Sequence, residues 1–251
     1  MANWQDPRST ADRTGGVSAA TVGVPSATRD AGLRSYMLSV YNYMASGVLL
    51  TGIVALLFAP YARDVLLSES GRGMSPLGWI ITLAPLGFVM AMSFGVNRMK
   101  TSTLQLLFWG FATVMGLSMS TLFLAYTGVS IAQTFFATAA AYAGLSLYGY
   151  TTKKDLSGFG TFLIMGVVGL LVAMVINIFL QSTAMAFAIS AIGVLLFAGL
   201  TAYDTQKIKS MYAYVAGTDM MGKSVVMAAL TLYLDFINMF QFLLSFMGDR
   251  R

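Results

Sequence analysis

Residues Val225–Met247 read VVMAALTLYLDFINMFQFLLSFM, an apolar run in which Asp235 is the single formally charged side chain. An α-helix rises about 1.5 Å per residue, so a run of this length crosses a hydrocarbon core of about 30 Å. A carboxylate deep in such a span costs roughly 2.5–3.5 kcal/mol even on a lenient insertion scale, so it usually faces a protein interior or a water-filled pathway. The stretch therefore predicts a transmembrane helix that carries a functional carboxylate.

Six further apolar blocks precede this one, each of about 20 residues or more. They are Tyr36–Ala59, Pro76–Val96, Leu104–Ala125, Ser130–Tyr150, Phe159–Leu180 and Ala184–Tyr203. A transmembrane barrel would instead show alternating segments of about 10 residues, a pattern that this sequence lacks. The blocks predict an all-α integral membrane protein with seven transmembrane helices.

The composition of the 251-residue chain agrees with a membrane location. Hydrophobic residues make up 57% of it and charged residues 10%, and the mean hydropathy is +0.73, whereas a soluble domain is about 25% charged. Residues 1–33 differ, because they are rich in Ser, Thr, Ala and Gly and lack the apolar core of a signal peptide. We expect a disordered tail over residues 1–33 and a seven-helix transmembrane domain over residues 34–251.

Basic residues gather on one side of this topology. The tail and the loops after the second, fourth and sixth blocks carry Arg8, Arg13, Arg29, Arg34, Arg98, Lys100, Lys153, Lys154, Lys207, Lys209 and Lys223, and the other side carries Arg63, Arg72, Arg250 and Arg251. The positive-inside rule predicts a cytoplasmic N-terminus and, after seven spans, a C-terminus outside. The net charge of +5 is explained by these loops, and no basic stripe with interleaved aromatic residues suggests nucleic-acid binding.

A second acidic residue, Asp204, closes the sixth block in GLTAYDTQKIK. By this topology it lies on the cytoplasmic side, as does the half of the last block that holds Asp235, and helices adjacent in sequence are usually neighbours. Thr201 shares a helix face with Asp204, and Asn238 shares one with Asp235. We therefore predict that the two carboxyl groups meet in the cytoplasmic half, with Thr201 and Asn238 as supporting polar residues.

Two carboxylates close together in a low-dielectric interior should not both be ionised. A shared proton would hold them together, and its loss would separate them or attract a cation. Carboxylate oxygens are hard ligands suited to Ca²⁺, so Asp204 and Asp235 are a candidate metal site when deprotonated. The alternative is structural: each Asp bonds a backbone or hydroxyl group and holds helices together.

Arg98 ends the second block in Asn97–Lys100, on the same side as Asp204. It could pair with a carboxylate and hold the inner end of the protein shut. It could equally be a positive-inside anchor that extends to the lipid headgroups. The charge pattern alone leaves both open.

Several activities common in seven-helix proteins require residues that are absent here. The chain has no His, which argues against membrane zinc hydrolases and intramembrane serine proteases, and Val225–Met247 has no Lys for a retinal Schiff base. Tyr203-Asp204 matches the first motif of intramembrane aspartyl proteases, but Asp235 lacks the glycine setting of the second. We expect no enzymatic activity and no bound cofactor.

The motifs TAYDTQKIK (Thr201–Lys209) and LYLDFINMFQFLL (Leu232–Leu244) resemble the Bax-inhibitor family, also called TMBIM, in its bacterial form. NRMK (97–100) and GLSMSTLF (Gly116–Phe123) agree with them, and the resemblance runs from about residue 34 to the end. It implies seven helices with the last surrounded by the other six, in the inner membrane of a bacterium. It also implies a pH-sensitive calcium leak in which Asp204 and Asp235 share a proton and Arg98 pairs with Asp204. Some relatives carry a Glu where this chain has Gly87.

The leading hypothesis is thus a calcium leak channel gated by protonation of the Asp204–Asp235 pair, with Arg98 as a latch and Ca²⁺ and protons as its partners besides lipid. A second hypothesis is a membrane regulatory protein, for example a modulator of a membrane protease, with no transport of its own. A third is a proton-coupled transporter, although the two halves show no convincing inverted repeat. The physiological ion, the direction of flux and the oligomeric state stay open.

Overall fold

The computed structural model describes residues 26–68 and 73–250, and these residues are almost entirely helical. The elements are α1 (Ser26–Phe58), the 3₁₀ turn η2 (Ala59–Tyr61), α2 (Ala62–Leu66), α3 (Pro76–Gly95), α4 (Thr101–Met119), α5 (Leu122–Ala125), α6 (Gly128–Thr151), α7 (Ser157–Leu180), α8 (Thr183–Val215) and α9 (Met220–Met247). Within the described residues, seven of these helices are long, and they correspond to the seven predicted blocks. Six of the seven are both long and apolar enough to cross a membrane.

The helix outside that set is α6, because it buries a polar face. Its buried side chains recur every three or four residues and are mostly polar: Ser130, Thr134, Thr138, Tyr142 and Ser146. Helix α6 is long enough to cross a membrane, at 24 residues, but the polar residues of this stripe lower its mean hydropathy. The all-helical fold is confirmed, and a membrane crossing by α6 stays a prediction.

Two helix boundaries differ most from the sequence prediction. Helix α1 begins at Ser26, inside the segment assigned to the tail, and its partly buried Leu33 packs against the core. A Cβ atom at Gly32 would collide with the hydroxyl of Tyr212, so the backbone of α1 lies directly against α8 there. Helix α8 runs on to Val215, well past the end of its apolar block. The rest of the predicted tail, residues 1–25, lies outside the described residues.

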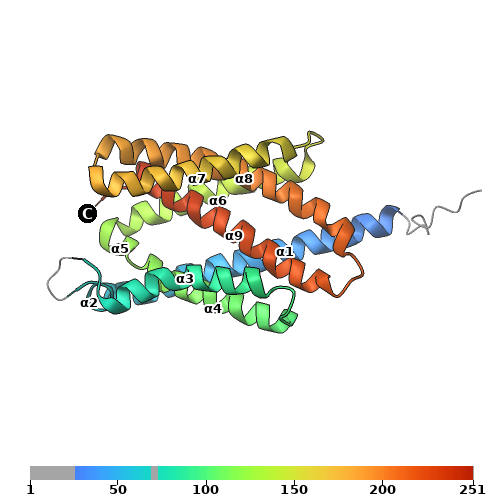
Figure 1. The fold of residues 1–251 in the computed structure, drawn as a ribbon, viewed down its shortest axis with the longest axis horizontal. Coiled ribbons are helices and arrows are strands. Elements are labelled where there is room, and N and C mark those ends of the chain that lie inside the picture. The colour runs from blue at the N-terminus through green and yellow to red at the C-terminus, as the bar shows by residue number, and fades with distance from the viewer. Residues whose placement is uncertain (1–25, 69–72, 251) are drawn as a thin grey trace, which may run out of the picture.

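Helix α9 passes through the middle of the bundle, between a group formed by α1, α3 and α4 and a group formed by α6, α7 and α8 (Figure 1). It packs most extensively against α8, then α1 and α6, and to a lesser extent α4. Helix α3 packs mainly on α4, and α7 mainly on α8. The last helix is therefore central, as expected, but four helices form most of its surroundings while α3 and α7 lie further out.

Burial follows this arrangement. Of the six apolar spans, α9 is the most buried and α7 the least buried. Leu232, Tyr233 and Leu244 of α9 are fully buried, whereas Phe179 of α7 is 82% exposed. Large apolar side chains on the outer surface are what a lipid solvent requires, so the exposure of α7 agrees with a membrane protein.

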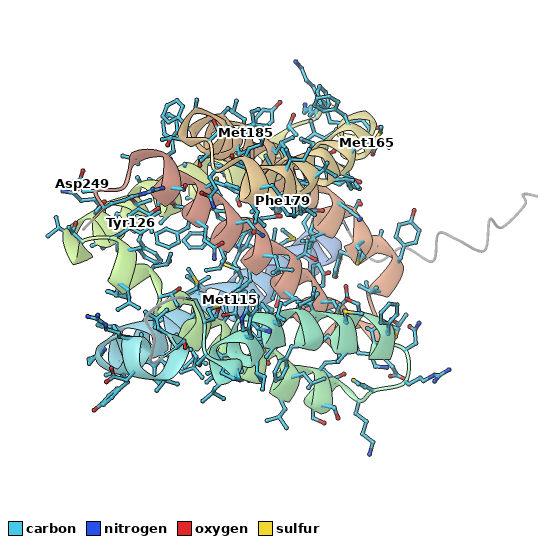
Figure 2. The ribbon with its side chains drawn as sticks, turned by 60° about the vertical axis from the view of Figure 1, so that its left-hand side comes forward. Met115, Tyr126, Met165, Phe179, Met185 and Asp249 are labelled. Carbon is cyan, nitrogen blue, oxygen red and sulfur yellow. The ribbon has the colours of Figure 1, made fainter. Side chains whose placement is uncertain are left out.

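The bundle has two chemically different ends. The end at which α1 begins, here called the basic end, carries Arg34, Arg98, Lys100, Lys153, Lys154, Lys207, Lys209 and Lys223. The opposite end carries Arg63 and Arg250 among the described residues. There the backbone N–H of Thr127 donates to Asp249 O at 3.2 Å and that of Asp249 to Ser130 Oγ at 2.9 Å, and Figure 2 shows Tyr126 and Asp249 at this end. The C-terminal residues are thus fixed to the start of α6.

Candidate functional site

Asp204 of α8 and Asp235 of α9 are brought together inside the bundle. Their side chains are 9% and 5% exposed, and the two carboxyl groups lie within hydrogen-bonding reach of one another. They meet because α8 and α9 pack along much of their lengths. The structure therefore places side by side the two carboxylates that the sequence singled out.

The supporting residues do not bond these carboxylates. Thr201 donates from Oγ1 to Phe197 O at 2.7 Å, and Asn238 donates from Nδ2 to Leu234 O at 2.8 Å. Each thereby satisfies a carbonyl one turn earlier in its own helix. Among the described residues, Asp235 Oδ2 is buried without a hydrogen-bond partner. A buried, unpartnered carboxyl oxygen is costly, and this leaves Asp204 as the natural partner for the pair's proton.

Two tyrosines from other helices complete the surroundings, and the sequence reasoning missed both. Tyr142 of α6 interacts electrostatically with both carboxyl groups and donates its hydroxyl proton to Leu232 O at 3.1 Å. Tyr41 of α1 places its hydroxyl 3.4 Å from Thr205 Oγ1 on α8. The polar stripe of α6 was the signal for Tyr142, since polar residues at helical spacing indicate a face turned inward.

A crevice between α1 and α6 leads from the basic end toward these tyrosines. It has a volume of about 570 Å³, and Arg34 and Tyr150 line its outer part. Tyr41, Tyr142 and Ser146 line its inner part. Ser146 Oγ is buried without a hydrogen-bond partner in the described part of the chain. The rest of its lining is mostly apolar and includes neither carboxyl group, so Tyr142 is the residue that connects the crevice to the pair.

The cations near the pair are arranged differently from the prediction. Lys207, one turn beyond Asp204 on α8, is the cation that acts on Asp204. Arg98 is exposed, and the described residues offer its side chain no hydrogen-bond or ion-pair partner. Lys223 donates from Nζ to Val96 O at 3.1 Å, so this lysine of α9, rather than Arg98, holds the end of α3. The latch role of Arg98 stays a prediction.

The TAYDTQKIK segment also has a structural role that its sequence did not reveal. Gln206 accepts from Leu156 N at 2.8 Å and donates to Lys154 O at 2.8 Å. Lys209 donates from Nζ to Tyr150 O at 2.7 Å. These bonds hold the α6–α7 loop against α8.

In that loop, hydrogen bonds from the Ser157 side chain and backbone keep the pKa of the exposed Asp155 carboxyl below its usual value.

The metal-binding capacity of the pair is limited. The described residues contain no group of three or more His, Cys, Asp or Glu side chains that could hold a metal ion. Ca²⁺ takes about six to eight oxygen ligands, and two carboxylates supply at most about four. This donor set suits an ion that keeps part of its water.

At Gly87 a Cβ atom would meet nothing within 4 Å, so the position where some relatives carry Glu faces open space.

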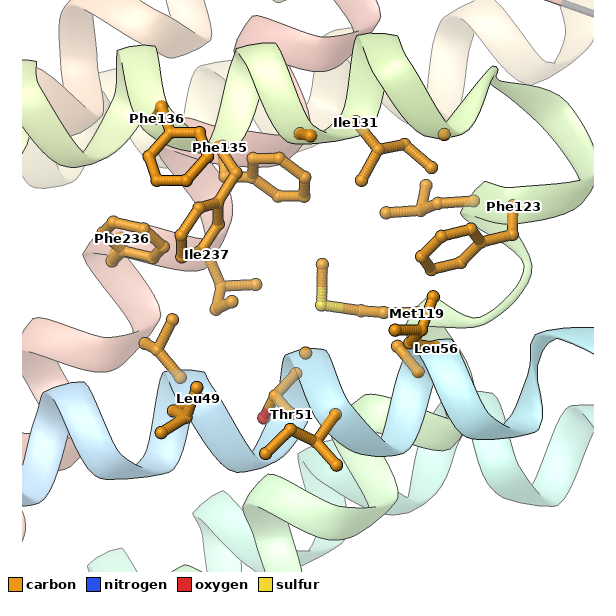
Figure 3. A pocket seen from close by; sticks show the side chains of 18 residues that line it. Leu49, Thr51, Leu56, Met119, Phe123, Ile131, Phe135, Phe136, Phe236 and Ile237 are labelled. Carbon is orange, nitrogen blue, oxygen red and sulfur yellow. The ribbon is translucent and has the colours of Figure 1, made fainter.

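An apolar pocket of about 400 Å³ lies elsewhere along the gap between α1 and α6. Figure 3 shows Leu49 and Leu56 of α1 facing Phe135 and Phe136 of α6, with Phe236 of α9 beside them. Its polar member, Thr51, is already engaged, because its Oγ1 lies 2.6 Å from the Tyr233 hydroxyl and 2.8 Å from Ala112 O. This pocket has no free polar group for an ion.

Comparison with known proteins places the chain among bacterial membrane proteins. A family model described as "Inhibitor of apoptosis-promoting Bax1" matches residues 33–251. Uncharacterized proteins of Rickettsia prowazekii and Caulobacter vibrioides are 49% and 48% identical, over 89% and 88% of this chain and 93% and 91% of their own lengths. The inner membrane protein YbhL of Escherichia coli is 43% identical over 88% of this chain and 94% of its own length. None of these three names states a catalytic activity.

Proposed function

Since the chain belongs to the Bax inhibitor family, we propose that it is a pH-sensitive calcium leak channel of a bacterial inner membrane. One observation carries the proposal: two carboxyl groups, Asp204 and Asp235, are buried against each other. Within the described residues neither forms a salt bridge that would neutralise it. A shared proton is the simplest way to stabilise such a pair.

The proposed gate works through electrostatic repulsion. When the pair holds one proton, one carboxyl group donates it to the other and α8 stays packed on α9. Loss of the proton leaves two negative charges at about 4 Å, a repulsion of about 4 kcal/mol at an effective dielectric of about 20. Tyr142 of α6 and Lys207 of α8 act on the pair electrostatically. Only Lys207 carries a positive charge, so the deprotonated pair attracts a further cation.

Calcium is then the permeant ion rather than a stored one. The deprotonated pair offers carboxylate oxygens of the kind that Ca²⁺ prefers, but too few to complete its coordination. An ion that keeps some of its water binds weakly enough to leave, which conduction requires.

The orientation belongs to the same proposal. With the basic end in the cytoplasm, as the positive-inside rule favours, α6 crosses together with the six apolar spans and the C-terminus lies outside. The crevice between α1 and α6 then opens toward the cytoplasm. Arg98 is exposed at this end and has no partner in the part of the chain that the structure describes. In this proposal a latch between Arg98 and Asp204 forms in another conformation.

A flux assay on purified protein tests the proposal. Proteoliposomes loaded with a calcium indicator should show calcium entry that rises with pH, by up to about tenfold per pH unit where one proton is released. Asp204→Asn combined with Asp235→Asn should remove the pH response, because neither amide titrates. The matched control is Asp155→Asn combined with Asp219→Asn, which alters two exposed carboxylates and should leave the response intact.

Two outcomes would contradict the proposal. The first is a pH response that survives the double substitution in the pair. The second is the absence of calcium flux at every pH from protein that is folded and inserted. Co-purification of a stoichiometric membrane partner together with that second outcome would favour a regulatory protein without transport.

A further inference from the structure

A groove with mostly apolar walls and a polar floor runs between α7, α8 and α9, on the side of the carboxyl pair away from the basic end. It consists of two adjoining cavities of about 380 Å³ and about 400 Å³ that share Asn177, Ala186 and Ser245 as lining residues. The outer cavity reaches Gln181 and Arg250 at the opposite end of the bundle. The inner cavity ends at Asn238, Phe197 and Phe242. We call these two cavities together the outer groove.

The floor of the outer groove is polar. Asn238, Gln241 and Ser245 follow one another along α9 at helical spacing, and Ser190 of α8 places its Oγ 3.0 Å from Ser245 Oγ. Gln241 is exposed, and its side-chain amide has no hydrogen-bond or ion-pair partner within residues 26–68 and 73–250. An amide that faces hydrocarbon without a partner costs several kcal/mol. Water in the groove removes this penalty, and lipid chains do not.

A stacked aromatic pair closes the inner end. The rings of Phe197 and Phe242 lie 5.8 Å apart between centroids, with planes 24° apart. Gly193 makes room for this stack, because a Cβ atom there would lie 2.5 Å from the Phe242 ring. Thr201 and Asp204 follow Phe197 by one and two helical turns and do not line the groove. Asn238, which lies one turn from Asp235 on α9, lines the groove beside the stack, so the stack and Asn238 together form the end of the groove that faces the carboxyl pair.

We propose that the outer groove is a water-filled vestibule for cations and that the Phe197–Phe242 stack is the hydrophobic barrier separating it from Asp204 and Asp235. Hydrophobic constrictions close ion pathways by excluding water. The identity of the ion rests on the proposed function, whereas the hydration of the groove and its closure by the stack do not. The vestibule and the crevice between α1 and α6 then approach the carboxyl pair from opposite sides.

The absence of cysteine from the chain makes a thiol-accessibility experiment direct. A charged, membrane-impermeant thiol reagent modifies only cysteines that water reaches, because the thiolate is the reactive form. It is added to the face that carries Arg250, on single-cysteine variants in sealed membranes. Ser245→Cys, in the groove, should react at least about tenfold faster than Ile192→Cys, a control on α8 that is 52% exposed on the outer surface.

The barrier is tested with a cysteine behind it. Thr201 is fully buried, so Thr201→Cys should react no faster than the Ile192→Cys control in the otherwise unchanged chain. Adding Phe242→Ala should raise its rate by about tenfold or more, because water then passes the stack. If Phe242→Ala does not give a monodisperse protein, Phe197→Ala or Phe242→Leu serves the same purpose.

The results separate this proposal from the channel proposal. Equal rates for Ser245→Cys and Ile192→Cys would overturn the vestibule. A Thr201→Cys rate that stays low after the stack is opened, or is already high before, would overturn the barrier. All rates are measured without calcium, so a failure of calcium flux does not change them. Conversely, a groove without water does not change the expected result of the flux assay on the Asp204–Asp235 pair.

Discussion

Asp235→Asn should make the protein more stable than the parent at alkaline pH and equally stable at acidic pH. In the parent, a proton shared with Asp204 is bound in the native state, whereas an unfolded chain releases the protons of its Asp residues above about pH 4. The native state therefore binds more protons, and its free energy of unfolding falls as pH rises, by about 1.4 kcal/mol per pH unit for one proton. The decline begins above about pH 4 and ends where the native pair itself loses the proton.

The size of the effect follows from the geometry. Two ionised carboxylates at about 4 Å repel by about 4 kcal/mol at an effective dielectric of about 20, which sets the upper limit of the difference. For a protein of this length about 1 kcal/mol corresponds to roughly 2–4 °C in Tm. The amide that replaces the carboxylate in Asp235→Asn cannot ionise, so the variant should exceed the parent by roughly 5–15 °C at alkaline pH.

Thermal unfolding in detergent, followed by tryptophan fluorescence from about pH 4 to about pH 9, measures this difference across the range in which the pair titrates. Asp155→Asn is the control with the opposite sign. Hydrogen bonds from Ser157 lower the pKa of the exposed Asp155. Its ionised form therefore stabilises the folded protein above the pKa of the unfolded state, and this stabilisation is lost as pH falls through the pKa of the folded state. A Tm difference between Asp235→Asn and the parent that does not change with pH would refute the shared proton.

Three further changes test the packing. Gly193→Ala should destabilise the protein by about 1–3 kcal/mol, because the added Cβ would overlap the Phe242 ring. Gly169→Ala is the control and should change Tm little, because a Cβ there meets nothing within 4 Å. Equal Tm values for the two variants would contradict this prediction. Thr51→Val should cost about 1–3 kcal/mol by leaving the buried Tyr233 hydroxyl without its 2.6 Å partner, and a Tm equal to that of the parent would count against it. Gln206→Ala should remove the two 2.8 Å bonds to the α6–α7 loop and speed proteolysis there, which limited digestion with gel analysis detects; an unchanged cleavage rate would oppose that role.

Much of the helical order was predictable because lipid imposes a simple rule: a crossing segment must be long and apolar. The pairing of Asp204 with Asp235 was also predictable, since adjacent helices tend to pack. Boundaries outside the lipid were less predictable. Helix α8 continues to Val215 through a polar sequence, because contacts with α1 and the α6–α7 loop stabilise it there.

The remaining features of the site depend on tertiary contacts between distant segments. Tyr142 and Tyr41 come from helices far from Asp204 in sequence, and a tyrosine in an apolar block is more often an ordinary core residue. Lys223 rather than Arg98 holds the end of α3, and a count of basic residues cannot distinguish two cations at the same end of a bundle.

The central position of α9 has a consequence for how the protein is made. Six long helices leave the ribosome before the helix that lies between them, so both three-helix groups enter the bilayer without their common partner. Until α9 arrives, Tyr142 lacks its carbonyl acceptor on Leu232 and the buried polar face of α6 has no complete surroundings. Assembly therefore ends with insertion of the segment that also brings Asp235, and a chain that stops early lacks its scaffold and its charge pair together.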